Sequence, residues 1–235
     1  MSAASGMREG LRQRRLYGRR RGRSLRAGQR ALIADLLPRL SIRLPDSGRL
    51  EPRRLFAAES GEAWLEIGFG AGEHLIAQAA AKPDAHFIGC EVFEPGIARL
   101  LGEIGRRELQ NIRIFTDDAR LLAAALAPRS LTGAYILFPD PWPKERHKKR
   151  RIVSLELLDD LAAAMEDGAE LRIATDDADY GEWIAERLGA HPAFAALAID
   201  HRPPDWPRTR YEEKAAAQGR TARLFRCRRR ARAPA

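Results

Sequence analysis

Residues 64–75, WLEIGFGAGEHL, join an apolar run to a helical pattern through three closely spaced glycines. The apolar run up to Ile67 is typical of a buried strand, and the helical pattern begins at Glu73. Glycines at such a junction permit a tight turn and let a ligand approach the backbone closely. A strand, a glycine turn and a helix in this order predict the first unit of an α/β fold with a ligand-binding loop.

The same alternation of short apolar strands and helices continues to residue 228. Strands are expected at 63–68, 86–93, 112–116, 133–139, 170–175, 195–200 and 222–228. Helices are expected at 73–81, 95–106, 119–126, 154–165 and 178–188, and at 27–40, where Pro38 ends the helix. Continuous apolar runs predict strands that are buried on both faces. We therefore expect an α/β, Rossmann-like fold with a mostly parallel seven-stranded sheet, helices on both faces and an antiparallel edge strand.

Positive charge is concentrated at the N-terminus. The 235 residues include 41 basic and 32 acidic side chains, for a net charge of +9, and the first 30 residues hold ten arginines against Glu9 alone. We expect residues 1–26 to form a flexible basic arm that binds a polyanion, with nucleic acid as the leading candidate. A solubilising tail and an organelle-import segment are the alternatives. Residues 27–228 are expected to form one domain, and residues 229–235 a basic tail.

Composition disfavours membrane and metal-dependent functions. No apolar run reaches the roughly 18 residues that a membrane helix needs, which predicts a soluble, cytoplasmic protein. Cys90 and Cys227 show neither a disulfide framework nor zinc-ligand spacing, so no metal is expected. Both cysteines are expected to be packing residues on strands.

Acidic residues follow four successive predicted strands, at the edge where α/β sheets bind ligands. The glycines are spaced G-x-G-x-G, and Glu73 stands where a dinucleotide fingerprint would have its last glycine. Glu66 precedes them by two residues, which favours a ligand with a cationic end over a pyrophosphate. Glu91 suits ribose hydroxyls and Asp118 suits a purine amino group, although Asp117 and Asp118 could instead cap a helix. A nicotinamide or flavin site stays open at this point.

Four separated motifs together resemble the bacterial tRNA (guanine-N7-)-methyltransferase family. They are EIGFGAG at 66–72, FPDPWPKERHKKRR at 138–151, ATD at 174–176 and TRYE at 209–212. A basic segment like YGRRRGR, residues 17–23, also precedes the domain in that family. The resemblance implies a class I methyltransferase fold and methyl transfer from S-adenosylmethionine to N7 of a tRNA guanine, guanine-46 of the variable loop. The implied partner is tRNA, with no obligate protein partner.

The resemblance also implies roles for individual residues. Asp140 is the implied catalytic residue. The implied cofactor-binding residues are Glu66, Gly68, Gly70, Gly72, Glu91, Asp118 and Asp140. The implied substrate-binding residues are Lys144, Asp176, Thr209, Arg210, Tyr211 and Glu212. The implied RNA-binding residues are Arg146, His147, Lys148, Lys149, Arg150 and Arg151.

The chemistry is consistent with these roles and leaves some alternatives open. Guanine N7 carries a free lone pair at neutral pH, so the reaction needs alignment and a nearby carboxylate rather than a general base. Trp142 could stack on the target base or fill the core. Methylation of an exocyclic base amine is disfavoured because the motif reads D-P-W-P. An RNA-binding module without catalysis is disfavoured because a pure binder needs neither the glycine loop nor Asp140.

Overall fold

The computed structural model describes residues 17–199 and 202–233. Positions 1–16 of the predicted basic arm and the last two residues of the predicted tail lie outside the described residues, as do residues 200 and 201. Within the described part, no helix is both long and apolar enough to cross a membrane.

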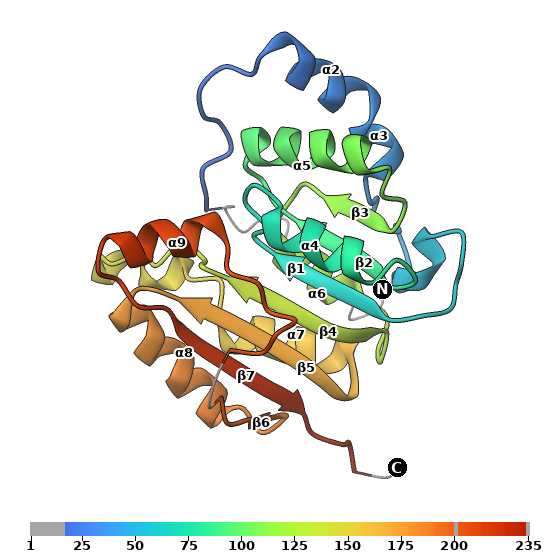
Figure 1. Cartoon of the computed structure of the whole chain (residues 1–235). Helices are drawn as coiled ribbons and strands as arrows, with labels where there is room; N and C mark the ends of the chain where they lie inside the picture. The colour runs from blue at the N-terminus through green and yellow to red at the C-terminus, as the bar shows by residue number, and fades with distance from the viewer. Residues whose placement is uncertain (1–16, 200–201, 234–235) are drawn as a thin grey trace.

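A seven-stranded sheet in the order β3-β2-β1-β4-β5-β7-β6 forms the centre of the domain (Figure 1). The strands are β1 (Ala63–Ile67), β2 (His86–Cys90), β3 (Ile112–Phe115), β4 (Leu131–Leu137), β5 (Met165–Thr175), β6 (Phe194–Ala196) and β7 (Arg223–Arg229). The first five strands are parallel, and β7 runs antiparallel to both β5 and β6. The predicted class is therefore confirmed, with the antiparallel strand one place inside the edge.

Helices cover both faces of this sheet. They are α2 (Ala27–Asp35), α3 (Leu37–Leu40), α4 (Glu73–Ala81), α5 (Glu94–Arg107), α6 (Ala119–Ala125), α7 (Leu155–Ala164), α8 (Ala178–Ala190) and α9 (Arg210–Ala217). Two short 3₁₀ helices, η1 (Pro52–Leu55) and η2 (Glu145–Arg150), complete the described elements.

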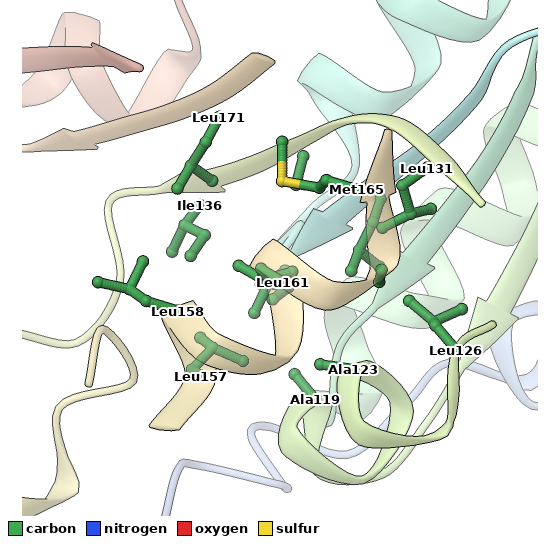
Figure 2. Packing of buried hydrophobic residues seen from close by; sticks show 14 of the residues in the cluster. Ala119, Ala123, Leu126, Leu131, Ile136, Leu157, Leu158, Leu161, Met165 and Leu171 are labelled. Carbon is green, nitrogen blue, oxygen red and sulfur yellow. The ribbon is translucent and has the colours of Figure 1, made fainter. Parts of the chain in front are cut away.

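Strand alternation divides the buried side chains into two cores. Leu65, Ile136 and Leu171 belong to one core, together with Leu122 of α6. Figure 2 shows Ile136 and Leu171 beside Leu157 and Leu161 of α7. Trp64, Phe87 and Tyr135 point to the other face, under α4 and α5. Successive strand residues face opposite sides, so burial of both sets explains the continuous apolar runs in the sequence. Cys90 and Cys227 are buried on β2 and β7, as predicted.

The strand order places the ligand-binding crevice. β1 lies between β2 and β4, so the chain leaves β1 and β4 toward opposite sides of the sheet. In open α/β sheets ligands bind beyond the carboxyl ends of the strands at such a switch point. The glycine loop follows β1 and the FPDPW segment follows β4, so both flank the crevice.

Two helix predictions were incomplete. Pro38 does not end the first helix, because α2 stops at Asp35 and Pro38 lies in the first turn of α3. Proline is tolerated there, since that N–H has no partner within the helix. The second difference is α9, which lies between β6 and β7 where no helix was expected. Figure 1 shows α9 beside the tip of β5.

A segment before α9 is anchored in the core by one large side chain. Trp206 is only 1% exposed and belongs to the core under α4. The Arg172 guanidinium lies 5.6 Å from the Trp206 ring centroid and pairs with Asp205 at 2.7 Å. Gln78 of α4 donates to the Asp205 carbonyl. The route from β6 to α9 is therefore fixed to both β5 and α4.

Arginines at the end of β7 and just after it bond back to the domain. The Arg232 guanidinium donates to the carbonyls of Ala162, Ala163 and Met165, at the carboxyl end of α7. Arg229 donates to the Ala162 carbonyl as well. The last carbonyls of a helix have no partner within it, and a cation there also favours the helix dipole. This part of the predicted basic tail thus caps α7.

Candidate active site

A cavity of about 280 Å³ opens at the carboxyl ends of β1 and β4. Its floor and near wall come from the glycine loop and α4, and its far wall from the end of β4 and from α9. The lining residues are Glu66, Gly68, Phe69, Gly70, Ala71, Glu73, His74, Arg99, Leu137, Phe138, Thr209, Arg210, Tyr211 and Lys214. The predicted residues Glu91, Asp118 and Asp140 lie outside this lining.

The glycine loop leaves room for a ligand. Gly68, Gly70 and Gly72 all have positive φ, at 77°, 55° and 81°, where other residues would be strained. A side chain at Gly68 or Gly70 would project into open space, whereas one at Gly72 would lie 2.6 Å from Leu100. Gly72 thus keeps α4 close to α5, and the other two glycines keep the cavity open.

Glu66 lies at the floor of the cavity and is only 3% exposed. Its carboxylate is 2.7 Å from the Nδ1 atom of His74, which is equally buried and lies edge-on to the Tyr135 ring. A buried carboxylate needs such a partner, because desolvation without one is costly. His74 was missed from the sequence, and the only available signal was its position in the first turn after the glycine loop. We assign His74 the role of positioning Glu66.

Glu91 organises the backbone of the same site. One carboxylate oxygen accepts from the Gly70 N–H at 2.9 Å, and the other accepts from Val92 and Phe93 at 2.7 and 2.9 Å. These bonds join the glycine loop to the start of α5. Its predicted contact with ribose hydroxyls stays a prediction, and a carboxylate has lone pairs left for it.

Asp118 caps α6 and pairs with a neighbouring guanidinium. Its carboxylate accepts from the Arg120 N–H at 3.0 Å, and both oxygens also bond to the Arg120 side chain. The capping alternative therefore holds for Asp118. Asp117 lies beside it, exposed, 3.4 Å from the Arg20 guanidinium of the N-terminal segment. Contact of Asp118 with a purine stays a prediction.

The segment after β4 holds Asp140 between two unusual backbone positions. Phe138 and Trp142 have φ values of 51° and 45°, in the left-handed region that bulky residues avoid. Such strain persists only where the surroundings hold it, and it is common at functional sites. Asp140 is exposed and makes no hydrogen bond or ion pair within the described ranges. Its carboxylate is thus available to a ligand.

Trp142 belongs to a surface cluster rather than to either core. Tyr17 and His147 present ring edges to it at centroid distances of 6.4 and 5.9 Å, and the Arg150 guanidinium lies 4.9 Å away. Arg150 also lies over the Tyr17 ring. The core-filling alternative for Trp142 is therefore wrong, and base stacking by Trp142 stays a prediction. The basic arm at Tyr17 reaches this cluster.

The basic run, residues 144–151, contains both exposed and buried cations. Lys144, Arg146 and Lys149 are exposed, whereas the Arg151 side chain is 0% exposed. Arg151 donates to the Pro141 carbonyl at 2.8 Å, pairs with Asp179 and lies between the rings of Tyr180 and Trp183. The RNA-binding prediction for Arg151 is corrected, because this guanidinium has no surface to offer and instead holds the loop after Asp140.

Two other members of the run, Lys148 and His147, are not free cations. Lys148 pairs with Glu145 and Asp179 at 2.9 and 3.2 Å. Partial burial and the nearby guanidinium of Arg150 lower the pKa of His147, so its imidazole is neutral at pH 7. A neutral ring adds no charge to a phosphate contact, which leaves the exposed cations as the stronger RNA-binding candidates.

The ATD and TRYE segments meet at the far wall of the cavity. The Tyr211 hydroxyl donates to Asp176 at 3.4 Å, and Asp176 also pairs with Arg220 beyond α9. Desolvation, followed by the negative charges of Asp140 and Asp177, raises the pKa of Tyr211, so the phenol stays protonated at neutral pH. The Tyr211 ring is 48% exposed and lies 5.2 Å from the Phe138 ring. It therefore offers an aromatic face at the mouth of the cavity.

The other TRYE residues hold α9 in place. Thr209 caps the helix through its hydroxyl, which accepts from the Glu212 N–H at 3.2 Å. Glu212 is buried and pairs with Arg202, so its carboxylate is directed away from the cavity's ligand space. The Arg210 N–H donates to Glu73 at 2.9 Å, which ties α9 to the helix of the glycine loop. Ligand contacts of Thr209, Arg210 and Glu212 stay predictions.

A seven-stranded sheet in this order, with a glycine loop after β1 and an acid after β2, defines a class I S-adenosylmethionine-dependent methyltransferase. The crystal structure of the 16S rRNA methyltransferase KamB is similar, with a TM-score of 0.55 and 15% identity over 73% of this chain and 89% of that one. The family described as "Putative methyltransferase" matches residues 60–224.

Curated relatives define the family more narrowly. A tRNA (guanine-N(7)-)-methyltransferase of Paramagnetospirillum magneticum is 51% identical, over 93% of this chain and 94% of the relative. One of Rhodospirillum rubrum is 45% identical, over 93% of this chain and 89% of the relative. The chain belongs to the tRNA (guanine-N(7)-)-methyltransferase family.

Proposed function

We propose that this protein transfers the methyl group of S-adenosylmethionine to N7 of a guanine in tRNA, with guanine-46 of the variable loop as the target. The observation that carries the proposal is the unpaired, exposed carboxylate of Asp140 after β4, two residues beyond Phe138, whose ring lies 5.2 Å from the exposed Tyr211 ring. The two relatives named tRNA (guanine-N(7)-)-methyltransferase, 51% and 45% identical over 93% of this chain, support tRNA guanine as the substrate. A cytoplasmic location follows from a tRNA substrate and is part of the proposal.

The cofactor half of the site fits S-adenosylmethionine. Open space at Gly68 and Gly70 and a buried acid at Glu66 suit a ligand with a cationic amino acid portion. Glu91 and Asp118 follow the next two strands, and we assign them the ribose and the purine of the cofactor. When bound, the cofactor supplies an electrophilic methyl group on a sulfonium centre.

Asp140 acts by charge rather than by proton transfer. The guanine N7 lone pair is free at neutral pH, and the purine ring becomes cationic as the methyl group is transferred. A fixed carboxylate beside the ring therefore stabilises the transition state more than the ground state. Tyr211 offers a face on which the base can stack, and Lys144 and Asp176 lie on the elements that surround it.

The reaction product tests the activity. Incubation of the protein with unmodified tRNA and labelled S-adenosylmethionine should give 7-methylguanosine on nucleoside analysis, and its position should map to guanine-46. A labelled exocyclic amine would refute the N7 chemistry, and a label at another guanine would refute only the position.

An isosteric variant tests the role of Asp140. Asp140→Asn should lower kcat by about 10²–10³-fold, the usual effect of removing one preorganised electrostatic group, with a small change in cofactor affinity. Glu145→Gln, an exposed acid on the following turn, is the matched control and should stay close to wild type. Equal losses of kcat and cofactor affinity in Asp140→Asn would make the residue a cofactor anchor.

A further inference from the structure

Two cations on the rim of the cavity are not accounted for by the roles above. Arg99 projects from α5 and Lys214 from α9, and both line the cavity. Both are exposed, and neither has a hydrogen bond or ion pair to another residue of the described ranges. Unpaired cations that face a ligand cavity are candidates for contact with an anion.

The rim is cationic even after its own acids are considered. Arg210, one turn before Lys214 on the same face of α9, lies 3.7 Å from Glu73 and is balanced by it. The Glu66 carboxylate is buried at the floor of the cavity, where it is bonded to His74. Arg99 and Lys214 therefore retain their full charges on the α5 and α9 side of the mouth.

A second set of exposed cations follows Asp140 in the chain. Lys144, Arg146 and Lys149 are exposed on the segment that follows Asp140. A base that reaches Asp140 and Tyr211 brings the phosphates of the neighbouring nucleotides to the rim of the cavity. Phosphate contacts fix the register of a nucleic acid without reading its sequence.

We propose that Arg99 and Lys214 bind the phosphodiester backbone of the nucleotides next to the target guanine, in addition to the basic run after Asp140. This rests on the proposed function, because it assumes an RNA substrate at the same cavity. The competing ligand is the carboxylate of the cofactor's amino acid portion. Exposure of both cations at the rim favours the phosphates, since a carboxylate bound in the cavity would be held by groups nearer its floor.

The double variant R99A/K214A tests the proposal through tRNA binding without turnover. Binding is measured by fluorescence anisotropy over a series of salt concentrations, without cofactor. Two lost single-strand phosphate contacts should reduce the slope of log K against log salt by about 1.4 and weaken binding roughly 25-fold at 0.1 M salt. R99K/K214R keeps both charges and should keep the wild-type slope.

R39A/R43A is the matched control, since both residues are exposed arginines on and after α3, on the β3 side of the sheet. It should leave the slope unchanged. Cofactor affinity of each variant is measured by calorimetry without tRNA. An R99A/K214A variant with the wild-type slope would overturn the proposal, and so would one that lost only cofactor affinity. Failure of the wild type to make 7-methylguanosine while these slopes hold would instead refute the proposed reaction alone.

Discussion

Gly96 is the position where the smallest substitution should have the largest effect on cofactor binding. It lies in the first turn of α5, and a Cβ atom there would be 2.1 Å from the carbonyl oxygen of Gly70. To reach even a tight contact of 3.0 Å, the glycine loop must move by roughly 1 Å. Helix propensity alone would make Gly96→Ala stabilising by about 1 kcal/mol. Overpacking against backbone opposes this with about 1–3 kcal/mol.

The loop displacement should appear in binding more than in stability. A displacement of about 1 Å can lower turnover by about 10²-fold, and S-adenosylmethionine affinity, measured by calorimetry, should fall as well. The melting temperature should fall by at most about 10 °C, so the variant stays folded at 25 °C.

Gly105→Ala, on the same helix, is the control because nothing lies within 4 Å of its new Cβ. It should keep wild-type affinity and gain about 0.5–1 kcal/mol of stability. If both variants bound the cofactor equally well, the contact between Gly96 and Gly70 would not control the loop.

Three further outcomes are expected. Tyr211→Ala should raise KM for tRNA by about 10–100-fold through lost stacking, with Tyr211→Phe near wild type; a change confined to cofactor KM would refute the stacking role. Arg232→Ala should lower the melting temperature by about 2–4 °C through loss of the α7 cap, and weaker tRNA binding at unchanged stability would show an RNA-binding tail instead. Burial raises the pKa of Asp160 to about 6 from its ordinary 3.8, so ionised Asp160 destabilises the fold above pH 6 and this penalty disappears as the pH falls toward 4. Asp160→Asn should therefore raise the melting temperature at pH 8 and not at pH 4, and an equal effect at both would contradict this.

The sheet and the glycine loop could be predicted because their sequence signals are local. Strands buried on both faces leave continuous apolar runs, and the glycines at 68, 70 and 72 stand next to the strand that they follow. The acids at the strand ends follow from the same alternation. None of these inferences needs information from a distant part of the chain.

The missed features depend on partners far away in the sequence. α9 has no large aliphatic residue and is held by the ion pairs Arg202–Glu212 and Arg220–Asp176. Arg151 looks like any other member of a basic run, and its burial is explained by Asp179 and the rings of Tyr180 and Trp183. Sequence periodicity carries no information about such long-range pairs. Charged residues that stabilise the fold were therefore expected at the surface.

The anchor at Trp206 limits how this site could be altered by evolution or by design. The segment between β6 and β7 carries Tyr211 and three other residues that line the cavity, and grafting it into a related scaffold is an obvious route to a new RNA specificity. Its buried indole, however, depends on Arg172 of β5, and its backbone depends on Gln78 of α4. The transferable unit is therefore discontinuous, and a graft that moved residues 202–222 alone would carry Trp206 and Asp205 into the new scaffold without the Arg172 guanidinium that they contact.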